Sequence, residues 1–256
     1  MTIQPDTTQL DSLEIDARGL YYRDLNARIR EKVAGGCRHL VLHHVCGQRY
    51  IGTGLREPLR IDIEGTPGND LGAFMDGPTV IVHGNAQDAC GNTLGGGEMV
   101  VYGRAGDTTG YSMRGGEILI QGDVGYRAGI HMKECGDRRP AIVIGGACQP
   151  FLGEYMAGGI ILLLGLSLRP GERLQANFIG TGMHGGVIYL RCPVEPWQLG
   201  AECGTSELNE QDWRQVRRLV QRYTHYFGGD AEEILQAPFT KVFPLSRRPY
   251  GNLYAY

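Results

Sequence analysis

Glycine residues recur at a fixed interval of 19 residues through the middle of this sequence. Two such series are Gly65, Gly84, Gly103 and Gly122, and Gly72, Gly91, Gly110 and Gly129. Of the 40 glycines, 29 lie within residues 65–186, without the Gly-X-Y period that collagen requires. A repeat of this length predicts a solenoid, in which each unit buries its apolar face only against its neighbours.

Each repeat ends in a short run of β-branched and aliphatic residues. The runs are TVIVHG, EMVVYG, EILIQG, AIVIGG, IILLLG and VIYLR. Glycines bound these runs, which is typical of buried strands, and no stretch of the repeat region carries a helical period. We therefore predict a mainly β fold, a parallel β-helix of about seven coils with about 19 residues per coil.

Two ladders of equivalent residues should run through the stacked coils. A corner needs a positive φ or room for the next backbone, which indicates a structural role for the glycines. This glycine ladder consists of Gly72, Gly91, Gly110, Gly129 and Gly153. An unbranched side chain adapts to irregular interior gaps, so the Met/Leu position of the repeat should point inward. It is occupied by Met75, Leu94, Met113, Met132, Met156 and Met183.

The sequence on either side of the repeats predicts two further segments. Residues 1–46 indicate an α/β cap, in which a strand, a helix ending at two glycines and a second strand cover one end of the β-helix of residues 47–192. Residues 193–256 predict a C-terminal helix over 209–227, with Asn209 as its N-cap, a second short helix and an extended tail.

Composition and charge exclude several classes of function. A net charge of −3 and a pI near 6.2 give no electrostatic footprint for nucleic acid or for an anionic membrane. The polar start MTIQPDTTQL indicates no signal peptide, and no apolar run is long enough to cross a bilayer. Seven cysteines without a C-x-x-C motif indicate free thiols. We expect a cytoplasmic protein that binds neither nucleic acid nor membrane.

Few residues in the sequence point to catalysis. His43 and His44 are neighbours on a predicted strand, where successive side chains point to opposite faces, so they should not converge on a metal ion. Asp88 and Asp107 are one repeat apart. If their carboxylates stack as a pair, the like charges would raise a pKa. Alternatively, each carboxylate bonds the turn backbone of its own coil. Because the second role is common for aspartate, no catalytic, cofactor-binding or metal-binding residue is predicted.

An insertion around KECGDRRP is the most polar departure from the coils, and its Cys135 is a candidate reactive thiol. Basic side chains in and near this insertion would bind an anion or a partner. Alternatively, the insertion is a solvated surface loop. The candidate partner contacts are Arg49, His131, Lys133, Arg138, Arg139 and His184.

The repeat G-x-x-x-D-x-x-G-x-x-M-x-G-G resembles the GXGXG repeat of the glutamate synthase C-terminal domain, a right-handed parallel β-helix. The segment GTPGNDLGAFMDGPTVIVHGNAQDACGNTLGGGEMVVYG is similar to its opening coils, and the resemblance covers about residues 47–190. The two flanks look like the stand-alone form of this domain. That form implies a hetero-oligomer with a glutamine amidotransferase-like subunit and an FMN- and iron–sulfur-binding glutamate synthase-like subunit, as in archaeal-type glutamate synthase and N-methylglutamate synthase.

The same repeat is similar to the β-helix subunit of formylmethanofuran dehydrogenase and of its formyltransferase/hydrolase relatives, where the β-helix also holds catalytic subunits together. The strings QDA, GYRAGIHMKE and YMAGG favour glutamate synthase. The amidotransferase nucleophile of that family is an N-terminal cysteine, but this sequence begins MTIQ and has no clustered cysteines for an iron–sulfur centre. The resemblance thus implies a non-catalytic scaffold, with FMN and the iron–sulfur cluster on a partner.

Two other β-helix classes fit less well. A polysaccharide-acting enzyme should carry carboxylates and aromatic residues along one strand face, where these repeats carry Val, Ile and Leu. A left-handed acyltransferase β-helix follows a hexapeptide pattern, which does not divide the 19-residue period.

Overall fold

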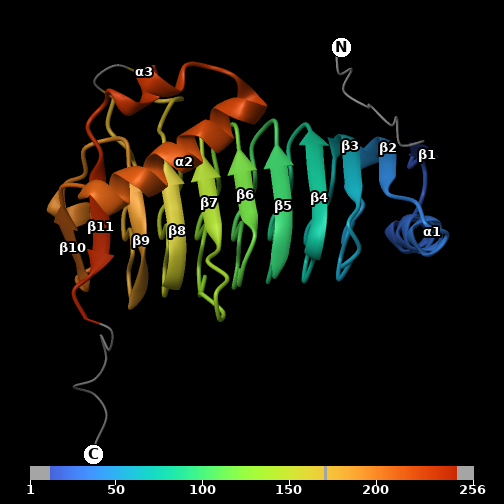
Figure 1. The fold of residues 1–256 in the computed structure, drawn as a ribbon, viewed down its shortest axis with the longest axis horizontal. Helices are drawn as coiled ribbons and strands as arrows, with labels where there is room; N and C mark the ends of the chain where they lie inside the picture. Colours follow the sequence, from blue (N-terminus) through green and yellow to red (C-terminus); the bar gives the residue numbers. More distant parts are fainter. Residues whose placement is uncertain (1–11, 170–171, 247–256) are drawn as a thin grey trace, which may run out of the picture.

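A computed structural model describes residues 12–169 and 172–246, which form one 11-stranded sheet in the order β1-β2-β3-β4-β5-β6-β7-β8-β9-β11-β10 (Figure 1). The strands of the repeat region are β3 (Arg60–Thr66), β4 (Asp76–His83), β5 (Gly96–Val101), β6 (Glu117–Ile120), β7 (Ala141–Ile144), β8 (Ala157–Leu163) and β9 (Gly185–Leu190). Each pairs in parallel with the next, so the chain returns to the sheet one strand further on after every turn. The predicted parallel β-solenoid is confirmed, with about six turns between these seven strands.

The N-terminal segment extends the same sheet. Its elements are β1 (Leu13–Asp16), α1 (Tyr22–Ala34) and β2 (His39–Cys46). β1 pairs in parallel with β2, and β2 with β3. The helix buries Leu25, Ile29 and Val33 against the core at this end of the solenoid (Figure 1). Residues 1–11, for which we expect no signal peptide, lie outside the described residues.

The C-terminal segment packs across the sheet and completes its other edge. Its elements are the 3-10 helix η1 (Pro196–Gln198), β10 (Cys203–Ser206), α2 (Glu210–Phe227), α3 (Ala231–Leu235) and β11 (Thr240–Pro244). β11 is the extended part of the tail and pairs antiparallel with β9 and β10, whereas residues 247–256 lie outside the described residues. None of the helices within the described ranges combines the length and apolar character that a membrane span needs.

Asn209 caps α2 as the sequence predicted. Its side-chain oxygen accepts a hydrogen bond from the Asp212 backbone N–H at 2.9 Å, and the Asp212 carboxylate accepts one from the Asn209 backbone N–H at 3.0 Å. This reciprocal pair satisfies two donors that the first turn of a helix leaves without intrahelical partners.

The interior of the solenoid is apolar along its whole length. Every member of the predicted Met/Leu ladder is fully buried. Strand residues facing the same interior stack in register, as Val80, Met99 and Ile118 do on β4, β5 and β6. Burial of these ladders stabilises the stack because each apolar side chain packs on its equivalents above and below.

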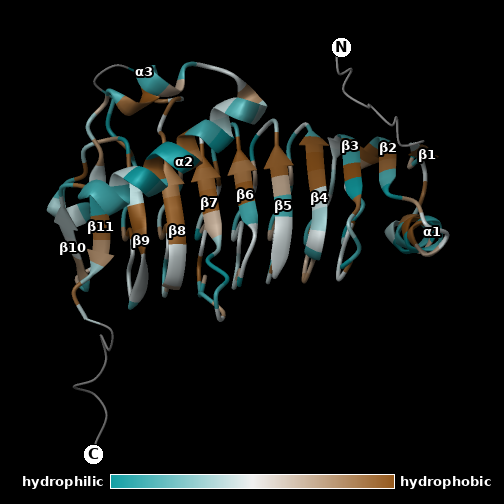
Figure 2. Cartoon of the chain, in the orientation of Figure 1, coloured by the Kyte–Doolittle hydropathy of each residue, from teal (hydrophilic) through white to brown (hydrophobic). Residues whose placement is uncertain are grey.

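The outward face of the sheet is also apolar from β5 to β9, where α2 lies across it (Figures 1 and 2). Val100, Leu119 and Val143 form one row on this face and pack in a cluster with Val216 and Val220 of α2. Both faces of these strands are therefore covered, which explains why their sequences are continuously apolar rather than alternating.

The glycine ladder lies where the chain turns before each strand. Gly129 and Gly153 have φ values of 73° and 68°. A Cβ on Gly129 would lie 2.5 Å from Cδ1 of Ile161, and one on Gly153 would lie 2.7 Å from Cδ1 of Ile188. Since these isoleucines are fully buried, glycine is needed here both for its backbone conformation and for the room it leaves.

Candidate functional site

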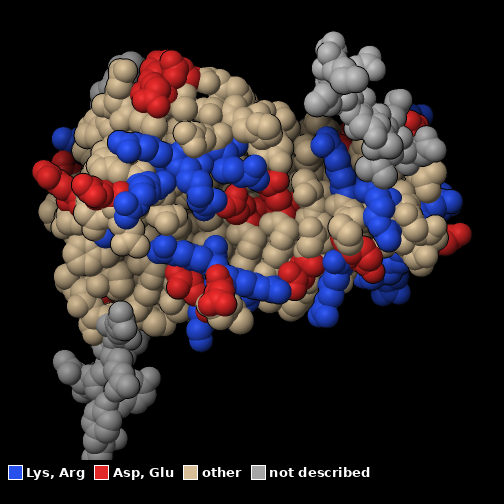
Figure 3. Space-filling view, in the orientation of Figure 1, with Lys and Arg blue, Asp and Glu red and all other residues tan. Residues whose placement is uncertain are grey.

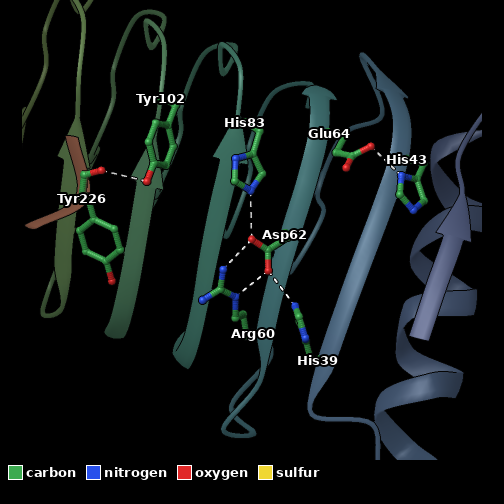
Figure 4. Close-up of polar contacts among 8 residues, drawn as sticks. All are labelled: His39, His43, Arg60, Asp62, Glu64, His83, Tyr102 and Tyr226. Atoms are coloured by element: carbon green, nitrogen blue, oxygen red, sulfur yellow. Dashed lines mark hydrogen bonds and ion pairs between the residues drawn. The ribbon is translucent and has the colours of Figure 1, made fainter. Parts of the chain in front are cut away.

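The outward face of the sheet changes from apolar to polar beyond the end of α2. Asp62 on β3 stands in register with Ile81 on β4 and Val100 on β5, so a carboxylate continues a row that is otherwise apolar. Figure 4 shows His39, Arg60 and His83 converging on Asp62 from β2, β3 and β4. These four residues are called the Asp62 cluster below.

The carboxylate of Asp62 is enclosed by nitrogen atoms. Arg60 donates from Nε to Oδ2 at 2.6 Å and from Nη2 to Oδ1 at 2.9 Å. The Nε2 atom of His39 lies 2.8 Å from Oδ2, and the Nε2 atom of His83 lies 3.0 Å from Oδ1. Asp62 itself is only 7 % exposed. Burial alone would raise its pKa, but the hydrogen bonds from Arg60, His83 and His39 outweigh burial and hold the pKa well below the ordinary range.

A second histidine–carboxylate contact lies beside the cluster. His43 on β2 places Nδ1 2.6 Å from Oε2 of Glu64 on β3, and this hydrogen bond raises the pKa of the His43 imidazole (Figure 4). On the other side, the His83 ring stacks on Tyr102, with 5.5 Å between ring centroids. The Tyr102 hydroxyl donates to the backbone oxygen of Tyr226 at 3.0 Å, which joins this face to the C-terminal end of α2.

Ion pairs hold that end of α2 on the sheet. Arg222 pairs with Glu98 on β5 and with Glu117 on β6, and its Nε atom lies 3.2 Å from the Glu117 carboxylate. The Tyr226 hydroxyl donates to Glu98 at 2.6 Å, and burial together with this bond raises the pKa of Tyr226 to about 12. Figure 3 shows Lys and Arg side chains gathered over α2 beside acidic ones. The open polar face thus begins where this network ends.

The Asp62 cluster is better suited to contact than to proton transfer. Both carboxylate oxygens already accept two hydrogen bonds or ion pairs, and a lowered pKa makes Asp62 a poor general acid. Across residues 12–169 and 172–246, no group of three His, Cys, Asp or Glu residues has the geometry to hold a metal ion. The face instead presents the outer parts of the Arg60, His39 and His83 side chains, which their bonds to Asp62 hold in position. That pattern fits hydrogen bonding to a partner surface.

The predicted contact residues fall into three places. Arg138 in the β6–β7 insertion pairs with Asp76 at 2.9 Å and donates to the Gly95 carbonyl at 2.9 Å, and Arg139 pairs with Glu134 at 2.9 Å. The Arg138 contacts fasten the insertion to the coils, whereas the Arg139 pair lies within the insertion. Arg49 lies apart, in a hollow of about 400 Å³ beside Tyr21 and Tyr22.

His131 lies in a turn, and Lys133 and His184 lie where the chain leaves the turns of their coils. The backbone N–H of Lys133 bonds to the Met113 carbonyl at 3.0 Å, and that of His184 bonds to the Met156 carbonyl at 2.9 Å, so both occupy the same position in their coils. The His131 ring stacks on Tyr155 of the next coil. That any of these residues contacts a partner remains a prediction.

The two aspartates of the repeat do not act as expected. Asp88 accepts from the backbone N–H of Asp107 at 3.0 Å, and Asp107 accepts from that of Tyr126 at 2.8 Å. The expectation that each bonds the turn of its own coil is therefore wrong, because their side chains reach the following coil.

His43 and His44 contact different carboxylates, Glu64 and Asp16.

The cysteines occupy different environments. Burial raises the pKa of Cys90 to about 12 and that of Cys192 to about 11, so these thiols are inert packing groups. Cys135 is exposed in the insertion, as predicted.

Sequence reasoning missed the Asp62 cluster. The degenerate first repeat, RIDIEG, places Asp62 inside a run that is apolar in later copies, such as TVIVHG. That substitution was the available signal, since a charged residue at a buried position is normally paired.

Comparisons with known proteins agree with this architecture. The sequence profile of the GXGXG motif family matches residues 31–245. An uncharacterized protein of Methanocaldococcus jannaschii, MJ1350, is 47 % identical over 253 residues, which cover 96 % of this chain and 97 % of that protein.

Among solved structures, the fold is similar to a chain of the formyltransferase/hydrolase complex FhcABCD from Methylorubrum extorquens, determined in complex with methylofuran. The TM-score is 0.54 at 21 % sequence identity, covering 88 % of this chain and 91 % of that one. This likeness bears on the fold. With the family profile spanning most of the sequence, the chain belongs to the GXGXG motif family.

Proposed function

We propose that this chain is a non-catalytic scaffold subunit of a glutamate synthase-type complex. In this proposal it holds a glutamine amidotransferase-like subunit beside an FMN- and iron–sulfur-binding subunit, which together form glutamate or N-methylglutamate. Ammonia produced by the first subunit, or an amine, would reach 2-oxoglutarate, and FMN on the second would supply electrons to reduce the imine.

One observation carries the scaffold role: the Asp62 cluster presents fixed polar edges on an open sheet face while its carboxylate is fully engaged. Such preorganised side chains bind a partner with little loss of conformational entropy. The resemblance of the coils to the glutamate synthase domain supports the identity of the partners. The cysteines do not fit an iron–sulfur centre, because no suitable group of ligands exists among the described residues.

A second candidate is a scaffold in a formyltransferase/hydrolase-type complex. The observation that favours it is the similarity in fold to a chain of FhcABCD, a complex of several subunits. Both candidates give this chain the same mechanical role and differ in the subunits that it would hold.

Affinity purification of the tagged chain from its native host, followed by mass spectrometry, separates the candidates. An amidotransferase and an FMN protein are expected in the first case, whereas a formyltransferase and an amidohydrolase-like subunit would establish the second. Absorbance of the purified chain provides the complementary test. A stoichiometric flavin or iron–sulfur chromophore on this chain alone would contradict the scaffold role.

A further inference from the structure

Exposed aromatic rings gather on the turns before the later strands. Tyr111, Tyr155 and Phe178 belong to successive parts of the stack and are 38 %, 36 % and 50 % exposed. Folding alone would favour polar side chains at such exposed turn positions. Several exposed rings on one side of a protein are a feature of interaction sites.

The rings are ordered by contacts between coils. His131 stacks on Tyr155 with 5.4 Å between centroids and 10° between planes, and Tyr111 meets His131 edge-on at 6.0 Å. Phe151 stacks on Phe178 at 4.9 Å and 15°. Rings already held in one conformation lose little side-chain entropy when a partner covers them.

The backbone at these positions makes the choice of aromatic residues informative. Tyr155 and Phe178 have φ values of 52° and 60°, a left-handed conformation that bulky residues seldom adopt. Ser112 and Thr108 adopt the same conformation in an earlier coil, with φ values of 53° and 54°. Because small residues serve the turn equally well, the fold does not require the rings.

Basic side chains border the rings. Arg114, Lys133 and His184 occupy one equivalent position on their coils, as the backbone hydrogen bonds to the coil before show. Neither Arg114 nor Lys133 has a carboxylate within ion-pair distance in the described part of the chain. Of the nearby carboxylates, Glu154 is buried and paired with Arg127 at 2.8 Å, and Glu202 accepts a hydrogen bond from the backbone N–H of Gly182 at 3.1 Å. The two cations of the strip therefore outnumber the one carboxylate beside it that lacks a cation.

We propose that this aromatic–basic strip docks a protein subunit whose contact surface combines aliphatic side chains with carboxylates. The strip is defined as Tyr111, Arg114, His131, Lys133, Tyr155 and Phe178. The inference rests on the proposed scaffold function and names a second contact surface for it, apart from the Asp62 cluster. The aromatic rings supply apolar contact area, and the cations complement acidic groups on the partner.

The dimensions of the strip suit such an interface. Equivalent residues of neighbouring coils lie about 4.8 Å apart, so the coils from Tyr111 to Phe178 span roughly 15 Å. A patch of about 800 Å² per partner is roughly 30 Å across, so the strip would form the centre of such an interface and the flanking turns its rim. An oligosaccharide is the less suitable occupant, because the faces of His131 and Tyr155 are stacked on each other rather than open to a sugar ring.

The test uses the complex with the partner subunits identified by purification from the host. A Tyr155→Ala/Phe178→Ala variant is expected to bind the partner at least tenfold more weakly than the wild-type chain, and Lys133→Glu should weaken binding with a reduced dependence on salt. Tyr21→Ala is the matched control, since Tyr21 is 59 % exposed on the N-terminal segment, outside the strip. Thermal melting of each variant verifies that it folds.

Carbodiimide cross-linking of the wild-type complex provides a test that needs no variant. It should join the Lys133 amine to a partner Asp or Glu. A complex that forms normally with the double alanine variant and yields no Lys133 cross-link would overturn the strip while leaving the scaffold function intact. A wild-type chain that recruits no partner would overturn both, and glycan binding abolished by the double variant would assign the strip to a different ligand.

Discussion

Replacement of Gly129 by alanine tests the role of the glycine ladder. At φ 73° an alanine would pay about 1–2 kcal/mol of left-handed backbone strain. Its Cβ would also lie 2.5 Å from Cδ1 of Ile161, which is fully buried. Overpacking of this kind destabilises by about 1–3 kcal/mol. We therefore expect Gly129→Ala to reduce the free energy of unfolding by about 2–5 kcal/mol in total.

Gly136 offers a matched control for the backbone contribution. It has φ 60° but no atom within 4 Å of the point where an alanine Cβ would lie, so Gly136→Ala should lose only the strain of about 1–2 kcal/mol. Ile161→Val removes the obstructing methyl group and should restore part of the stability of Gly129→Ala in a double-mutant cycle. Urea unfolding followed by circular dichroism measures all five proteins: the four of the cycle and Gly136→Ala. Equal losses for Gly129→Ala and Gly136→Ala would refute the packing argument.

Three further predictions concern Asp62, Arg222 and the cysteines. Asp62→Asn should lower the melting temperature at neutral pH. Because the folded pKa of Asp62 lies below its ordinary 3.8, the difference in melting temperature between this variant and the wild type should shrink as the pH falls below about 4. A difference that stays constant with pH would contradict the ion-pair role. Arg222→Ala should cost about 1–2 kcal/mol in urea unfolding and reduce hydrogen-exchange protection in α2, since Glu98 loses its cation. Cys135 should react rapidly with a thiol reagent in the folded protein and Cys90 only after unfolding, as peptide mass spectrometry would detect.

The solenoid was predictable because its period is written in the sequence. The spacing from Gly110 to Gly129 sets the length of one coil, and the same spacing brings Met113 and Met132 into one interior column. Such regularity needs no knowledge of distant contacts, because each coil packs only on its neighbours.

The candidate site was less predictable because it depends on what covers the sheet. His39, Asp62 and His83 come from three strands, and their approach requires the register that the coils adopt. The position of α2 decides which part of the outward sheet face remains open. The sequence of α2 predicted that the helix has an apolar side, but it did not predict which strands that side would cover. The reach of Asp88 to the next coil likewise depends on side-chain direction, which spacing does not specify.

The domain boundaries at residues 46/47 and 192/193 remain predictions. In the structure one sheet runs from β1 through the repeats to β10, so the expected cap and C-terminal segments share it with the coils. The edge strands of this sheet are β1 and β10, which are four residues long each, and short edge strands limit edge-to-edge association.

Native mass spectrometry of the tagged chain, purified gently from its host, tests the scaffold role most directly. We expect a hetero-oligomer containing at least two different catalytic subunits, with flavin and iron–sulfur mass on those subunits and none on this chain after dissociation. Recovery of this chain only as a monomer or as copies of itself, under conditions that preserve other complexes of the host, would contradict the scaffold role.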